Sequence, residues 1–176
     1  NAADVCTVST TSTSVDASQS QPGCAGTAND DVWFTFVATA KAHRIVVNAG
    51  STGGVKFPTI QLFSGACGSL TSVACQSAGL ETNNTLDQPG LIAGTTYFVR
   101  VHSVGTSLDD DGTFSICVTT LNDECTEAYL LPVNNDTTCA ISTNGNNLFA
   151  TQSQPGCTGT ADDDVWYKFV ATSTAH

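Results

Sequence analysis

Histidines, aspartate clusters and cysteines are the residues of this chain whose types and spacing could carry chemistry. The three histidines are His43, His102 and His176, and they stand among many serines and threonines. No Gly-x-Ser-x-Gly turn presents a serine as a nucleophile. Hydroxyl residues are so abundant that a Ser, a His and an Asp will meet by chance. We therefore expect no catalytic residues and predict that the protein is not an enzyme.

Aspartates gather at three places where turns are expected. Residues 29–31 and 162–164 match each other, and the third place is Asp109, Asp110 and Asp111. Ca²⁺ prefers several carboxylate oxygens at loop positions, so this third triplet could hold a weak calcium ion. The alternative is that these aspartates accept hydrogen bonds from backbone N–H groups in turns. None of the clusters has the spacing of the twelve-residue calcium loop with its closing Glu, and we expect no other cofactor.

The even number of cysteines predicts disulfides. The spacings contain no Cys-x-x-Cys pair and histidine is sparse, which disfavours a zinc site. Disulfides persist in oxidising compartments, so the cysteines indicate an extracellular or cell-surface protein. We predict that all eight form disulfides: Cys6, Cys24, Cys67, Cys75, Cys117, Cys125, Cys139 and Cys157.

Spacing suggests the pairings. Cys67 and Cys75 flank a short turn and could close a hairpin, while Cys6 with Cys24 recurs as Cys139 with Cys157. A loop of the latter length would stabilise the fold by about 3 kcal/mol in the chain-entropy model. This leaves Cys117 with Cys125, although Cys125 with Cys139 is an alternative.

The chain carries one stretch twice. Residues 1–43 and 134–176 align without a gap at an offset of 133 positions, with QSQPGC, DDVW and FVAT shared. A repeat of this length is too long for a solenoid unit and close to the size of one domain. We predict that residues 1–120 form one bead that lacks its first segment, and that residues 121–176 form the first part of a second copy.

Composition limits the partners. Charged residues make up only 12% of the chain, and its net charge of −11 reflects a shortage of Lys and Arg. Binding to nucleic acid or to an anionic membrane is therefore not expected. No apolar run approaches the roughly 18 residues of a membrane span.

The hydrophobic pattern is that of an all-β protein. Residues 32–37 alternate and are rich in aromatic and β-branched side chains, as in a half-buried strand. Many short strands at intervals of about 10 residues indicate a β-sandwich. The expected strands are residues 32–37, 44–48, 58–64, 70–75, 95–103 and 113–119.

Trp33 and its copy Trp166 have two interpretations. Exposed aromatic rings stack on sugars in carbohydrate modules, which would make polysaccharide a partner. Large aromatic side chains are more often buried, and we favour packing within the fold.

The order DDVWFTFVAT, RIVV, PTIQLFSGACGSLTSVAC, GLIAGTTYFVRVHS and GTFSICVTT resembles bacterial domains of the pre-peptidase C-terminal type. It is most similar to the cysteine-containing version that opens with NDEC and recurs in secreted and surface proteins. The resemblance implies a jelly-roll-like β-sandwich that accompanies enzymes or builds surface arrays without being catalytic. It covers one whole bead, formed by residues 121–176 joined to 44–120.

Together these features predict a structural protein, a subunit or segment of an extracellular bacterial filament or surface array with an adhesive or matrix role. Its partners would be other copies of itself. Either one long chain carries many beads in tandem, or subunits exchange strands as in donor-strand assembly. The alternative class is a carbohydrate-binding accessory module of a secreted hydrolase. The residues expected to join neighbouring beads are Leu121, Asn122, Asp123, Glu124, Tyr129, Leu130, Leu131 and Val133.

Overall fold

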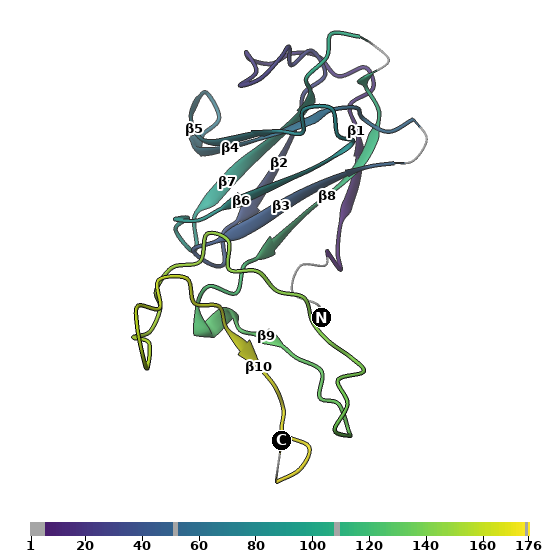
Figure 1. Cartoon of the computed structure of the whole chain (residues 1–176). Coiled ribbons are helices and arrows are strands. Elements are labelled where there is room, and N and C mark those ends of the chain that lie inside the picture. The colour runs from purple at the N-terminus through teal and green to yellow at the C-terminus, as the bar shows by residue number, and fades with distance from the viewer. Residues whose placement is uncertain (1–5, 51–52, 108–109, 175) are drawn as a thin grey trace. The chain divides into compact units, whose positions relative to one another are not determined.

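The structure is a computed structural model that describes residues 6–50, 53–107, 110–174 and 176. The chain divides into two compact units (Figure 1). One unit is Val8–Thr119, and the other combines Asn1–Thr7 with Thr120–His176. Each unit is described by itself.

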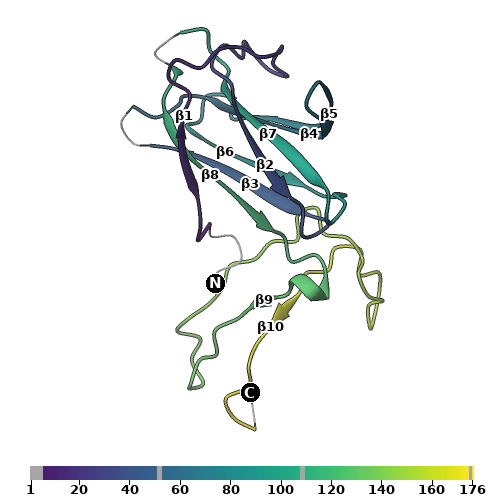
Figure 2. The same cartoon turned by 180° about the vertical axis from the view of Figure 1, so that it is seen from behind.

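The Val8–Thr119 unit is a sandwich of two antiparallel four-stranded sheets, seen from opposite sides in Figures 1 and 2. The first sheet has the strand order β1-β8-β3-β6 and the second has the order β2-β7-β4-β5. The strands of the first sheet are β1 (Thr10–Thr13), β8 (Thr113–Thr120), β3 (His43–Ala49) and β6 (Asn83–Gln88). Those of the second are β2 (Val32–Val37), β7 (Thr96–Ser103), β4 (Pro58–Ala66) and β5 (Ser69–Ser77). The prediction of an all-β sandwich is confirmed.

The core lies between the two sheets, where the inward residues of each strand meet. Val47, Ile60, Leu62 and Val101 have no exposed surface. Burying one such side chain stabilises the fold by roughly 1.5–3 kcal/mol. The apolar face of every long strand is therefore committed to this interior.

Six strands lie where alternation predicts them, and two lie where it does not. The polar β6 has Leu86 in the core, while the Asn84 amide donates to the carbonyls of Pro58 (2.8 Å) and Gln76 (2.7 Å). The β1 strand, Thr-Thr-Ser-Thr, has no apolar residue and pairs with β8 through its backbone. Hydrophobic periodicity cannot detect either strand, because backbone and amide hydrogen bonds hold them in place.

The second unit has little regular structure. It contains a 3₁₀ turn, η2 (Cys125–Glu127), and two short parallel strands, β9 (Tyr129–Leu130) and β10 (Tyr167–Lys168). Its backbone repeats a local feature of the first copy. Asp16 has a φ of 62° and Phe149, located 133 positions later, has a φ of 64°. The described residues of the chain form no helix long and apolar enough to cross a membrane.

Candidate assembly site

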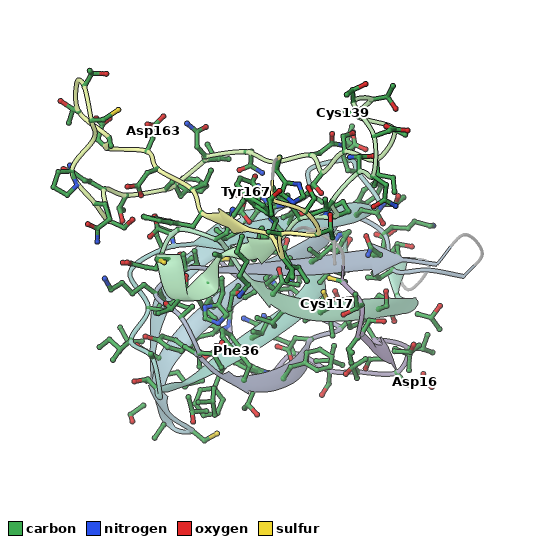
Figure 3. The ribbon with its side chains drawn as sticks, turned by 90° about the horizontal axis from the view of Figure 1, so that it is seen from below. Asp16, Phe36, Cys117, Cys139, Asp163 and Tyr167 are labelled. Atoms are coloured by element: carbon green, nitrogen blue, oxygen red, sulfur yellow. A yellow bond between two sulfur atoms is a disulfide. The ribbon has the colours of Figure 1, made fainter. Side chains whose placement is uncertain are left out.

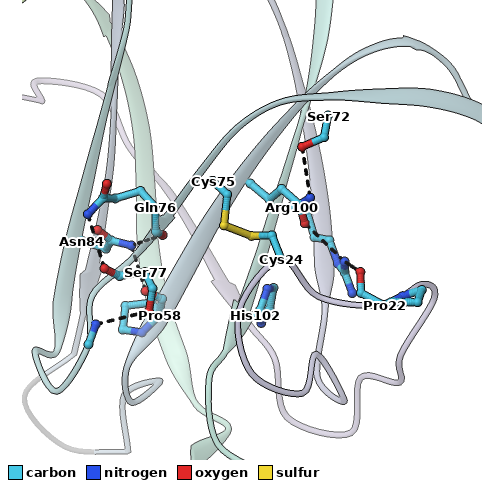
Figure 4. The surroundings of a disulfide bond; sticks show 12 residues. Pro22, Cys24, Pro58, Ser72, Cys75, Gln76, Ser77, Asn84, Arg100 and His102 are labelled. Atoms are coloured by element: carbon cyan, nitrogen blue, oxygen red, sulfur yellow. Dashed lines mark hydrogen bonds between the residues drawn. A yellow bond between two sulfur atoms is a disulfide. The ribbon is translucent and has the colours of Figure 1, made fainter.

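A buried arginine clamps the loop before β2 onto the outer face of the second sheet. Arg100 lies beside Trp33 on β2 and Gln61 on β4 in the strand register. Its Nε donates to Asp31 Oδ2 at 2.9 Å, and Nη2 lies 2.6 Å from the same oxygen. Nη1 donates to the carbonyl of Pro22 at 2.9 Å (Figure 4). The polar face of β7 is buried because this loop covers it.

A disulfide holds the same loop. Cys24 is bonded to Cys75 on β5, across 51 positions of sequence (Figure 4). The predicted pairings of Cys24 with Cys6 and of Cys75 with Cys67 are therefore wrong. The clamped loop brings Cys24 over the sheet, so that spatial proximity and not sequence proximity decides the partner.

The remaining cysteines fall into two groups. Cys6 and Cys117 are also disulfide-bonded. Four others are free and exposed, contrary to the prediction that all eight are bonded: Cys67, Cys125, Cys139 and Cys157. Cys157 occupies the place of Cys24 in the second copy, but the described part of its unit contains no strand equivalent to β5 that would bring a partner to it. The expected pairings of Cys125 and of Cys139 with Cys157 are absent as well.

Trp33 is half-buried on the outer face of the second sheet. Its ring centroid lies 5.2 Å from that of Phe63, and the Arg100 guanidinium carbon lies 5.7 Å from it. Its indole Nε1 donates to Ser20 Oγ at 3.0 Å, and Ser20 Oγ donates to Asp31 Oδ2 at 2.9 Å. The Trp33 ring thus contacts Arg100 directly and is linked to its partner Asp31 through Ser20.

The second copy reproduces this local network. The indole of Trp166 donates to Ser153 Oγ at 2.5 Å, and Ser153 Oγ donates to Asp164 at 2.8 Å. Desolvation is the largest single influence on the pKa of Asp164 and raises it. The combined hydrogen bonds from Ser153, Gln154 and Trp166 nevertheless hold this pKa below its usual value. The network therefore forms locally from residues 153–166, without a buried arginine.

The segment predicted to join beads lies along β10 within its own unit. Asn122 O accepts from the N–H of Trp166 at 2.8 Å, and Trp166 O accepts from the N–H of Tyr129 at 3.1 Å. Lys168 O accepts from the N–H of Leu131 at 2.7 Å. The segment and the copy of β2 thus form a short parallel ladder.

Side chains of the same segment add to this ladder. Asp123 accepts from the backbone N–H of Thr151 at 2.6 Å and from its hydroxyl at 3.0 Å. Leu121, Asn122 and Asp123 are buried, and the rings of Tyr129 and Tyr167 meet edge to face at 6.4 Å. Among the other predicted residues, Glu124 precedes η2, Leu130 lies in β9 and is half-exposed, and Val133 lines a hollow with Leu131.

The two histidines of the sandwich lie within strands, His43 in β3 and His102 in β7. His43 is buried, and its Nε2 accepts from the N–H of Thr39 at 3.3 Å. Burial lowers the pKa of His43. His102 is fully buried, and its Nδ1 donates to Ser103 O at 2.7 Å. Burial is also the main cause that lowers the pKa of His102.

The third aspartate triplet does not form a metal site in the part of it that is described. Asp109 lies outside the described residues. Asp110 lies 3.9 Å from the ammonium of Lys56. Burial, followed by the charge and hydrogen bond of Asp30, raises the pKa of Asp111. No three His, Cys, Asp or Glu residues of the described chain are grouped so that they could hold a metal ion. The calcium site expected at the whole triplet stays a prediction, since it includes Asp109.

Two stacked antiparallel sheets, a loop stapled by a disulfide and a repeated Trp-Ser-Asp network place the chain among disulfide-bonded β-sandwich proteins. Residues 2–116 and 121–176 match the galactose-binding-domain-like family associated with type IX secretion. The chain belongs to this family. The two matched stretches correspond to the two copies seen in the sequence. The resemblance to pre-peptidase C-terminal domains is therefore right at the level of a β-sandwich family, and the family itself is a different one.

A crystal structure of a protein from Sulfurospirillum deleyianum, titled GEBA250068378, is similar with 8% sequence identity and a TM-score of 0.34. The match covers 64% of this chain and 97% of that one. A search of curated proteins found no match. The family and the disulfides indicate a secreted or cell-surface module.

Proposed function

We propose that the protein is a structural building block of an extracellular bacterial filament or surface array, made of repeating β-sandwich beads, and that it is not an enzyme. The observation that carries this proposal is the repeat of local structure. The Trp-Ser-Asp network recurs 133 positions apart, and so does the residue with a positive φ, Asp16 in one copy and Phe149 in the other. A chain that carries one bead and the first part of a second copy is suited to making identical contacts in a row.

One exposed aromatic side chain in the second copy supports assembly. Phe169 is 55% exposed, whereas its equivalent in the sandwich, Phe36, is partly buried against the core. An apolar side chain that is covered in one copy and uncovered in the other is available for contact with another protein. The partner in this proposal is another bead, of the same chain or of another copy.

The test is the mass of the assembled material before and after reduction and denaturation. Light scattering should give particles much heavier than the 18.1 kDa of this chain under native conditions. A mass that stays high after denaturation identifies tandem beads, and a fall to about 18 kDa pieces identifies exchanged subunits. Monodisperse 18 kDa particles under all native conditions would overturn the proposal.

A second candidate is a carbohydrate-binding accessory module, favoured by the family description and by the two tryptophans. The Trp33 ring, however, packs on Phe63 and Arg100 and donates to Ser20, so little of it is free to stack on a sugar. Glycan-array binding that is lost on Trp33→Ala, with the sandwich still folded, would favour this candidate.

A further inference from the structure

Among the described residues, no strand pairs with the outer edge of β2. It is the end strand of its sheet, with β7 on its inner side. Just beyond the paired region, the N–H of Ala38 donates to Thr95 O, which precedes β7. Backbone groups of alternate residues in an antiparallel pair point to opposite edges. Ala38 and the even-numbered residues of β2 therefore direct their backbone groups toward β7. The N–H and C=O groups of Trp33 and Thr35 face the outer edge.

The second copy shows which kind of segment fits such an edge. Trp166 and Lys168 stand 133 positions after Trp33 and Thr35. Their backbone groups bond to Asn122, Tyr129 and Leu131 in the parallel ladder described above. The same sequence motif thus has an extended strand on its outer edge in one copy and an open edge in the other.

A second contact has the same relation. Asp123 accepts from the N–H and hydroxyl of Thr151. Ser18 stands at the equivalent position in the sandwich and is exposed, with no hydrogen-bond partner among the described residues. Its N–H and hydroxyl are the donors that a second Asp123 would accept from.

An apolar groove completes the match. Leu131 lines a hollow with Thr143 and Tyr167 in the second copy. The equivalent residues Thr10 and Phe34 line a groove of about 150 Å³ in the sandwich. Its other lining residues, two of them labelled in Figure 3, are Val8, Thr35, Phe36, Val99, Ile116, Cys117 and Val118.

We infer that the outer edge of β2, Ser18 and this groove together bind residues 121–131 of a second copy of the chain. The inference rests on the proposed function and names its contact surface. In its own unit, the segment lies on a copy of β2 that has no described equivalent of β8 behind it. On β2 of another chain, Leu131 also contacts Ile116 and Val118 of β8. This is an apolar contact that the described residues of its own unit do not supply.

A peptide of residues 120–133 with Cys125→Ser, labelled with fluorescein, tests the surface directly. Added to the full chain, it should bind saturably in fluorescence anisotropy. Thr35→Pro should weaken binding at least tenfold, because proline removes an outward N–H and obstructs the edge. Val37→Pro is the matched control. Val37 also faces outward, but its equivalent in the second copy, Val170, lies beyond the ladder formed by residues 166–168. This control should change the affinity less than twofold.

Both proline variants should keep the sandwich, because an outward N–H makes no bond to β7. Their thermal midpoints check this. Replacing Asp123 by Ala in the peptide should also weaken binding, by several-fold, through loss of the contact to Ser18. No peptide binding, or equal binding to the wild type and Thr35→Pro, would overturn the inference.

Sedimentation of the full chain separates this inference from the proposed function. Wild-type chains should self-associate with rising concentration, and Thr35→Pro should reduce the weight-average mass while Val37→Pro does not. Filaments that form equally well with Thr35→Pro would refute the docking site and leave the filament proposal standing. Peptide binding that depends on Thr35, in a chain that never forms filaments, would support the docking site and refute the filament role.

Discussion

Asp31→Asn tests the arginine clamp, and the repeat supplies its control. In the sandwich, the side chain of Asp31 is 2% exposed and that of Arg100 is not exposed at all. Asparagine keeps the shape of the aspartate but removes the charge that balances the guanidinium. Removing one partner of a buried ion pair costs about 3–5 kcal/mol, because the other charge stays buried and unpaired. Arg100 keeps its bonds to Pro22 and Gln61, so we expect the lower end, about 3 kcal/mol.

This loss corresponds to a fall in thermal midpoint of roughly 10–15 °C for a unit of this size. Scanning calorimetry measures it on the full chain. The control is Asp164→Asn, which changes the equivalent residue of the second copy. Asp164 is half-buried and has no arginine partner in the salt bridges of the described residues, so the sandwich transition should not move. A midpoint for Asp31→Asn within about 2 °C of the wild type would refute the reasoning. A loss of even 1 kcal/mol should lower the midpoint of this unit by about 4 °C.

Two further predictions concern the staple and the histidine. Cys24→Ser opens a loop of 51 positions and should cost about 4 kcal/mol in denaturant unfolding by the chain-entropy model, whereas Cys157→Ser removes a free thiol and should cost nothing measurable. Equal unfolding midpoints for the two variants would contradict the assigned disulfide. Burial lowers the pKa of His43 from 6.5, so the unfolded state binds more protons between that value and the lowered one. Stability should be full above pH 6.5 and fall as the pH drops through this window. His43→Gln should remove part of that fall in a pH series of thermal midpoints, and His176→Gln, at an exposed position, should not. An unchanged slope with His43→Gln would argue against the burial effect.

The sequence predicts the sandwich because apolar alternation marks the strands that build the core. Tyr97, Val99 and Val101 alternate along β7 and all face the interior. The same pattern fails on the other face of this strand, where Arg100 and His102 are fully buried. Polar residues on alternate positions normally face solvent. Here the loop before β2 covers them. The alternation of polar and apolar residues along β7 does not predict that covering loop.

The disulfides show a second limit of the sequence. Local spacing favours short loops, but Cys24 pairs with a residue 51 positions away. Its partner is fixed by strand register, which places Cys75 beside Gln61 and Gln61 beside Arg100. Register is set by long-range pairing and cannot be read from cysteine spacing.

The assembly segment was accessible from the sequence because the repeat exposes it. Residues 121–133 precede one copy of the repeated stretch and are therefore candidates for a shared role. The prediction could not give the parallel ladder with Trp166 and Lys168, because two-residue strands leave no periodic signal. The hydrogen bonds of Asp123 to Thr151 were likewise invisible, since turn contacts depend on backbone geometry.

Cryo-electron microscopy of the native material tests the central claim most directly. The account predicts filaments or sheets of identical β-sandwich beads, with each bead in contact with the next. Traced density should show an extended segment along the outer edge of β2. Isolated single beads at all concentrations, with the β2 edge facing solvent, would contradict the account.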